Sequence, residues 1–294
     1  MKGPFLHRSG AHIHAVGPWP FITRRSYMRE GRHVVWMARR SRKGLDFFGQ
    51  TRTESGPPFW QSAGYNWGLG AFFAAGSFLF MLGSAMSLVP AGALQPSALA
   101  ANIMFFLGSI PFTIAAYMQH FQAANARAFT LDPKAPGPRR LALIGWHPTS
   151  AGWLSTFTQF LGTIAFNVNT FDAILNPQGW YRQDVAVWVP DMIGSVLFLV
   201  SGYLAFIEAG HRYWSWRPRD LSWRIVFVNL IGCIAFMTSA VLAYVPPGPE
   251  PAWIDTVSIV HLLAGALCFF VGAILTMQEA LANGREPDAC VAGS

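Results

Sequence analysis

The sequence has few charged residues. Asp, Glu, Lys and Arg make up only 12% of its 294 residues, whereas 52% of the residues are hydrophobic. An ordinary soluble domain carries about 25% charged residues. The composition therefore argues against a soluble domain and indicates a membrane protein, although the length alone would suit one or two soluble domains.

Cysteine is also scarce. The chain has three cysteines, Cys233, Cys268 and Cys290, and none belongs to a Cys-x-x-Cys pair. Cys233 and Cys268 lie in apolar runs, whereas Cys290 lies in a polar tail. This pattern implies no disulfide framework and no zinc site, so we interpret the cysteines as structural.

The short motifs of soluble catalysis are missing as well. The sequence has no Gly-rich phosphate loop, no Gly-x-Ser-x-Gly and no His-Glu-x-x-His. His120, His147 and His211 lie near one border of the apolar segments and form no pair that could hold haem. We expect a non-enzymatic protein with no catalytic residue, no metal and no cofactor. We also expect no cleavable signal peptide, because the first apolar run begins near Leu69.

Six long apolar segments dominate what is present. Each has about 20 residues or more, which is enough to cross a hydrocarbon core of about 30 Å as a helix. Lipid offers no partner for backbone N–H and C=O groups, so each segment must be helical. We therefore predict an all-α membrane fold with six transmembrane helices. The segments span 68–89, 98–121, 153–175, 188–209, 224–245 and 256–279.

Lys and Arg are unevenly distributed around these segments. All of the 21 Lys and Arg residues except Arg182 fall in stretches that six crossings would place on one side. These stretches are the N-terminal arm, the loops 122–152 and 209–224, and the tail. Cytoplasmic loops carry an excess of Lys and Arg. The pattern predicts that both termini are cytoplasmic and that the protein lies in a bacterial inner membrane.

The basic stretches also suggest partners. We predict that residues 1–65 form a basic, largely irregular arm with one short helix at about 33–43. We predict that residues 281–294 form a flexible tail. The arm and the loop 211–219 suit anionic lipid headgroups, which contribute about 1 kcal/mol per basic residue near the surface. No folded module for nucleic acid is visible, and no protein partner is indicated.

Two short patterns alternate along the chain, three times each. In the first, third and fifth segments a Trp is followed after eight residues by Gly, and after three more by Phe. In the other segments Gly is followed after three residues by Phe, and after nine more by Gln or Glu. The residues are Trp67-Gly76-Phe80, Trp153-Gly162-Phe166, Trp223-Gly232-Phe236, Gly108-Phe112-Gln122, Gly194-Phe198-Glu208 and Gly265-Phe269-Glu279.

The spacing between the two patterns is nearly constant. From the Phe of the first to the Gly of the second there are 27, 27 and 28 residues. Such agreement indicates three tandem copies of one helical hairpin, at 66–123, 152–209 and 222–280. Small residues let helices approach closely in lipid, and the Phe one turn later shares the face of its Gly. We therefore predict that the Gly-x-x-x-Phe residues form the stripe along which the two helices of each hairpin contact each other.

The ends of the patterns form three predicted interface pairs. Each Trp begins a hairpin and each Gln or Glu ends it on the same side, which gives Trp67 with Gln122, Trp153 with Glu208, and Trp223 with Glu279. A carboxylate at a helix C-terminus opposes the helix dipole and needs a partner. We considered the Trp indole N–H of the same hairpin, a neighbouring Arg such as Arg212, and plain solvation.

This hairpin resembles the YrhK-like domain. That domain is a two-helix membrane unit in bacterial proteins, and no activity is established for it. The resemblance rests on the Trp, Gly and Phe positions given above and would cover about 65–282 as three units. It implies a membrane fold but supplies no catalytic residue. Three hairpins are also found in mitochondrial carriers, but the Pro-x-acid-x-x-base signature of those carriers is missing here.

A group of polar residues lies inside the predicted spans, where ionisable side chains are costly and suggest function. The repeat alignment places them at similar depth in the outer half of the bundle, where they could bind a proton, a cation or a polar headgroup. Alternatively, Asp191 simply caps its helix after Pro190 and the asparagines link helices. The residues are Asn167, Asn169, Asp172, Asp191 and His261.

These patterns allow two main functions. The first is a structural or lipid- or small-ligand-binding membrane protein, and a purely structural scaffold predicts a tightly packed apolar centre with the glycine stripes inside the hairpins. The second is a small-solute or ion transporter, which predicts polar residues around a central cavity. A redox subunit is a third and weaker possibility, which would require a light-absorbing cofactor.

Overall fold

The structure is a computed structural model of the 294-residue chain. Cys290 and most of the predicted tail lie outside the residues that it describes. Those residues are 13–29, 31–45, 57–90, 92, 96–131, 141–248, 251 and 253–285.

Six long α-helices form the body of the described part of the chain, and each overlaps one of the apolar segments. Five of them are long and apolar enough to cross a membrane. Helix α4 is long enough as well, but its mean hydropathy is lower. The chain is therefore a mostly helical, multi-pass membrane protein. The helices are α2 (Ala63–Ser87), α3 (Ala98–Ala124), α4 (Ala151–Ile174), α6 (Val189–Gly210), α7 (Leu221–Leu242) and α8 (Trp253–Arg285).

Polar side chains set where several of these helices begin. Ser62, Ser97 and Ser150 cap α2, α3 and α4, and Asp220 caps α7, each by accepting a hydrogen bond from a backbone N–H of the first turn. Helix α6 begins differently. The short helix α5 (Trp180–Gln183) and a π-helical turn, η3 (Asp184–Trp188), lead into it without a break.

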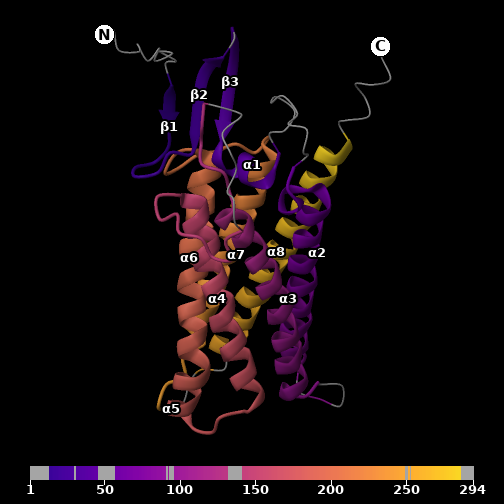
Figure 1. Ribbon diagram of the computed structural model, residues 1–294. Coiled ribbons are helices and arrows are strands. Elements are labelled where there is room, and N and C mark those ends of the chain that lie inside the picture. Colours follow the sequence, from indigo (N-terminus) through magenta and orange to yellow (C-terminus); the bar gives the residue numbers. More distant parts are fainter. Residues whose placement is uncertain are drawn as a thin grey trace, which may run out of the picture.

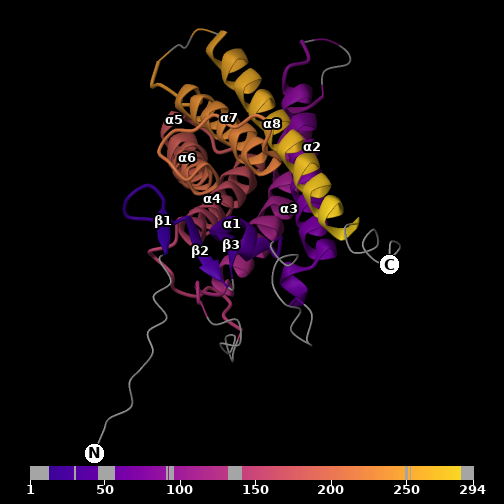
Figure 2. The ribbon, with the colours of Figure 1, turned by 90° about the horizontal axis from the view of Figure 1, so that it is seen from above.

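The six helices form a closed ring in chain order. Each helix packs against the next one along the chain, and α8 returns to pack against α2. Seen from above, the helices surround a common centre (Figure 2). The side view shows neighbouring helices running in opposite directions (Figure 1). Such a ring leaves a central axis toward which all six helices can direct side chains.

The N-terminal arm is folded in its described part, contrary to the sequence prediction. Strands β1 (His14–Val16), β2 (Arg24–Arg29) and β3 (Arg32–Met37) form an antiparallel sheet in that order. Helix α1 (Ala38–Lys43) follows directly. The sheet and α1 lie at one end of the ring, which we call the arm end, and α5 lies at the other, the far end (Figure 1).

Contacts with distant residues explain why the arm looked irregular in the sequence. The tight turn between β2 and β3 uses Gly31 at a φ of 75°. Tyr27 and Trp36 then pack edge-on against Phe129, which follows α3, with ring centroids 5.6 and 5.5 Å away. Short arginine-rich strands carry only a weak local pattern, so these tertiary contacts decide the structure.

The helices of each predicted hairpin approach closely at the patterned glycines. A Cβ placed on Gly76 would lie 2.8 Å from the carbonyl oxygen of Gly108 and 2.5 Å from Cδ2 of Phe112. A Cβ on Gly108 would lie 3.0 Å from the carbonyl oxygen of Gly76. The other two pairs are Gly162 with Gly194, and Gly232 with Gly265. In each pair, rings from the facing helix fill the space that the missing side chains leave.

Candidate functional site

Six phenylalanines close the centre of the ring, and we call them the Phe septum. They are the Phe residues of the two patterns, namely Phe80, Phe112, Phe166, Phe198, Phe236 and Phe269. Within each hairpin the two rings meet edge-to-face, with centroids 5.7, 5.0 and 5.1 Å apart. The rings from α3, α6 and α8 also contact one another, forming one layer. The septum separates two cavities.

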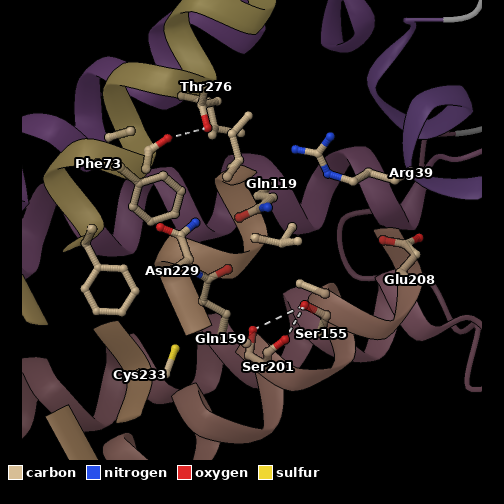
Figure 3. Close-up of a pocket in the computed structure, with 18 of the residues that line it drawn as sticks. Arg39, Phe73, Gln119, Ser155, Gln159, Ser201, Glu208, Asn229, Cys233 and Thr276 are labelled. Carbon is tan, nitrogen blue, oxygen red and sulfur yellow. Dashed lines mark hydrogen bonds between the residues drawn. The ribbon is translucent and has the colours of Figure 1, made fainter. Parts of the chain in front are cut away.

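The arm-end cavity lies between the septum and α1 and has a volume of about 70 Å³. All six long helices and α1 contribute to its wall. The amide groups of Gln119, Gln159 and Asn229 point toward one another across it (Figure 3). At its edge the hydroxyl of Ser155 donates to the carbonyl oxygen of Ser201 at 2.9 Å. The cavity is therefore lined by neutral polar groups deep inside the bundle.

Cations from α1 close this cavity at the arm end. Arg42 donates from both terminal nitrogens to the two carboxylate oxygens of Glu208, at 2.7 and 2.9 Å. Arg39 binds Glu279 in the same two-pronged way, at 2.8 and 3.3 Å, and Lys43 also donates to Glu279. All five side chains are buried. We call this group the ionic cap.

Burial and charge oppose each other in the ionic cap. Burial alone would lower the pKa of Arg39, but the carboxylate of Glu279 raises that pKa above its usual range. Burial lowers the pKa of Lys43 to about 8, although Glu279 acts against the shift. Arg39 and Arg42 add to the lowering by like-charge repulsion. Two carboxylates thus bind three cations in the ionic cap.

The predicted Trp partners of the two glutamates are wrong. The indole N–H of Trp153 donates to the carbonyl oxygen of Ile144 at 3.0 Å, and that of Trp223 donates to the hydroxyl of Ser215 at 3.1 Å. A charged guanidinium binds a carboxylate more strongly than a neutral indole does. The alternative of an arginine is correct in kind, but the arginines come from α1 and not from Arg212.

The first hairpin ends differently because it has no acid. The side-chain amide of Gln122 donates to the carbonyl oxygen of Trp60 at 2.6 Å and to Oδ1 of Asn66 at 3.0 Å. Trp67 is instead 46% exposed. Asn66 rather than Trp67 therefore contacts Gln122.

The far-end cavity lies on the other side of the septum and has a volume of about 450 Å³. All six long helices contribute to its wall, which includes the rings of Phe80, Phe166, Phe236 and Trp188. Its acidic groups are Asp191 and Asp255, and no Lys, Arg or His is among the described residues that line it. Small-molecule pockets measure roughly 300–1,000 Å³ and combine apolar walls with a few polar groups. This cavity has that character.

Asn169 and Asp191 meet at the wall of the far-end cavity. The side chain of Asn169 lies beside the carboxylate of Asp191, and its Oδ1 is buried without a hydrogen-bond partner among the described residues. Asp191 lies early in α6, which continues α5 and η3 without a break, so it does not cap a free helix N-terminus as the alternative interpretation from the sequence proposes. The preceding Trp188 is fixed by a 2.9 Å hydrogen bond from its indole N–H to the carbonyl oxygen of Ala240.

The structure brings together only these two of the five residues proposed for a polar site. Asn167 faces α3 instead and donates to the hydroxyl of Thr113 at 2.8 Å. His261 bonds the carbonyl oxygen of Val257 in its own helix at 2.8 Å. Neither of them, nor Asp172, lines the far-end cavity. The repeat alignment gives depth along the bundle but not rotation about each helix axis, so residues of equal depth can face different neighbours.

Sequence reasoning missed the ionic cap and Trp188. A signal for the cap was present, because Arg39, Arg42 and Lys43 are spaced three and four residues apart and so share a helical face. For Trp188 no local signal existed, since its place depends on the π-helical turn. Among the described residues, no group of three His, Cys, Asp or Glu side chains could hold a metal ion.

No protein-family model, curated protein or solved structure matches this chain. The resemblance to the YrhK-like domain therefore stays a prediction. What the fold itself establishes is a multi-pass membrane protein whose central axis carries two chemically different cavities.

Proposed function

We propose that this protein is a non-enzymatic integral membrane protein that binds a small organic cation in its far-end cavity. The observation that carries the proposal is the carboxylate of Asp191 beside several aromatic rings in one cavity of about 450 Å³. An ammonium group is attracted both to a carboxylate and to the face of an aromatic ring. The described lining residues include no cation that would compensate the acid.

The proposal includes three tandem hairpins that cross the membrane six times. Helix α4 is less apolar than the others because polar side chains of its inner face line the two cavities. Its exposed face is apolar, since Leu161, Ile164, Val168 and Phe171 are 38–48% exposed and recur every three or four residues. Such a stripe suits contact with lipid. The glycine contacts common to the three hairpins support the repeat.

The proposed orientation places the arm end in the cytoplasm of a bacterial cell and the far end outside. This orientation follows from the distribution of Lys and Arg, because nearly all of them lie on the arm-end side and cytoplasmic loops carry an excess of these residues. A single Cys introduced at Leu143 or at Gln178 of a Cys-free variant tests it. We expect a membrane-impermeant thiol reagent to label intact cells at position 178 alone, and labelling at position 143 would contradict the orientation.

Ligand binding can be tested with a matched pair of probes. Choline carries a quaternary ammonium, and 3,3-dimethylbutan-1-ol is its neutral analogue of the same shape. We expect the purified protein to bind choline, measured by calorimetry, at least about tenfold more tightly than the alcohol, because each tenfold is about 1.4 kcal/mol. Equal binding of the two probes, or binding of neither, would contradict a site for organic cations.

A pair of variants locates the site. Asp191→Asn keeps the shape of the side chain but removes its charge, and we expect it to weaken choline binding by about tenfold or more. Asp172→Asn is the control, because Asp172 belongs to the same polar group of the sequence but does not line the cavity. A loss of binding in the control alone would place the ligand elsewhere.

A second candidate function is transport of the same solute. It is favoured by the two cavities, which lie in the centre of one ring and are separated only by the Phe septum. Proteoliposomes loaded with unlabelled choline test this function. A transporter should accumulate labelled choline by exchange, and Asp191→Asn should abolish the exchange. Binding without exchange would leave the binding function alone.

A further inference from the structure

The ionic cap contains more positive than negative charge. Its described side chains are three cations and two carboxylates, all at most 9% exposed. Asp220 also acts on Arg39 through its charge, but it lies exposed at the start of α7 and is therefore screened by water. Among the side chains that the structure describes, one buried positive charge of the ionic cap has no carboxylate of its own, which is costly unless a counter-charge is nearby.

This surplus charge faces a cavity lined by polar groups, among which Oε1 of Gln122 and Oδ1 of Asn229 are buried acceptors without a hydrogen-bond partner among the described residues. Arg39, Arg42 and Lys43 all line the arm-end cavity, and Nε of Arg42 is buried without a hydrogen-bond partner among the described residues. The amides of Gln119, Gln159 and Asn229 reach into the same space (Figure 3). Glu208 is the one carboxylate among the described residues that line it, and Arg42 already occupies both of its oxygens.

We infer that the arm-end cavity binds one small inorganic monoanion of about the size of chloride, held between the ionic cap and the amide groups. A single negative charge balances the cap, whereas a divalent anion would overcompensate it. One water needs roughly 10–15 Å³ of such space, so about 70 Å³ accommodates a halide with a few waters and is too small for a large organic acid such as gluconate. The Phe septum closes the other side.

The pKa of Lys43 agrees with this assignment of an anion to the arm-end cavity. Burial is the main cause of its lowered pKa of about 8, and the like charges of Arg39 and Arg42 lower this pKa further. A bound anion would favour the charged ammonium and raise that pKa. The anion site does not depend on the proposed cation site, because the two cavities lie on opposite sides of the septum and share no charged residue.

The test uses the full-length protein in a neutral detergent. Thermal unfolding is measured in sodium gluconate and then in chloride, bromide, nitrate or sulfate at equal ionic strength. A ligand that binds only the folded state stabilises it by mass action. We expect the monovalent inorganic anions to raise the midpoint by about 3 °C over gluconate, and sulfate to have no such effect. Equal midpoints in all salts would overturn the inference.

Two variants assign the effect to the cavity. Lys43→Met leaves two arginines with two carboxylates, so we expect the chloride effect to disappear. Gln159→Leu removes a donor without altering the ionic cap, and we expect it to weaken the halide dependence by about tenfold. This second variant decides the question if the first fails to fold. Arg212→Met removes an exposed cation from the same end and should keep the wild-type response.

A direct measurement comes from crystals grown in bromide. An anomalous peak between the ionic cap and Asn229 would support the site, and it should vanish in Lys43→Met. Peaks confined to the protein surface would overturn the inference. So would a halide dependence that survives unchanged in both cavity variants.

Discussion

The two ends of the helical ring use acidic side chains in opposite ways. At the arm end, Glu208 and Glu279 are buried and bound by cations from α1. At the far end, Asp191 and Asp255 line a cavity without a described cation. A buried carboxylate must be paired, whereas one in a roomy cavity retains water or a ligand. The difference suggests that the arm-end acids hold the structure together and the far-end acids serve binding.

The largest predicted effect follows from this difference. Glu208→Gln removes one partner of a buried ion pair and leaves Arg42 without its counter-charge, which should cost about 3–5 kcal/mol of unfolding free energy. Asp191→Asn should cost at most about 1 kcal/mol, the usual net contribution of one hydrogen bond, because no described cation lines the cavity beside Asp191. Denaturant unfolding in detergent measures both. Similar losses in the two variants would remove the distinction between the two ends.

The next effect concerns the septum that keeps the two cavities apart. Gly76→Ala places a Cβ 2.8 Å from the carbonyl oxygen of Gly108 and 2.5 Å from the ring of Phe112. The backbone oxygen cannot turn away, so overpacking should cost about 1–3 kcal/mol. Gly68→Ala in the same helix meets no atom within 4 Å and should be neutral or slightly stabilising. Equal stability of the two variants would contradict a close contact at Gly76.

How much the sequence could predict depends on the range of the interactions. The six helices follow from apolar runs, which are a local property, and all six were placed with errors of a few residues at their ends. The approach of Gly76 to Gly108 follows from the same kind of pattern. The sheet of the arm does not, because Tyr27 and Trp36 depend on Phe129 from a distant loop.

The candidate site shows the same limit more sharply. The sequence indicates that Asn169 and Asp191 are unusual, because they are polar residues within apolar helices. It does not indicate that Asn167 and His261 face other neighbours. Rotation about a helix axis is set by all the neighbours of that helix at once. The partners of Glu208 and Glu279 were missed because α1 lies more than 160 residues away along the chain and no pattern links the two.

A smaller effect concerns the membrane surface at each end. The loop after α6 exposes Trp214 and Trp216, at 67% and 65%, among arginines that include Arg212 and Arg219. We expect Arg219→Gln to weaken the retention of anionic lipid by about 1 kcal/mol, or roughly fivefold, as measured by native mass spectrometry. Arg182→Gln, at the far end, should leave retention unchanged. A loss in both variants would indicate a general effect of charge.

The smallest effect is a pH dependence that we expect at the arm end. His211 ends α6 at a φ of 60°, and its Nδ1 lies 2.9 Å from the hydroxyl of Thr23, so it joins the bundle to the segment between β1 and β2. Burial, with Arg217 and Arg24, lowers the pKa of His211 from 6.5 to about 4. The folded state therefore binds fewer protons than the unfolded state does. The contribution of neutral His211 is fully present above pH 6.5 and is lost as the pH falls toward 4.

Replacing His211 by Asn separates this titration from the other groups of the arm end. Asparagine tolerates a positive φ and can still bond Thr23, but it does not titrate. Protection factors of the sheet amides, which correct for the slower intrinsic exchange at low pH, should decrease between pH 6.5 and about 4 in the wild type, and this decrease should be smaller in His211→Asn. Helices at the far end should show no such change. If the sheet of the variant loosened at the same pH as that of the wild type, another group would control the attachment of the arm.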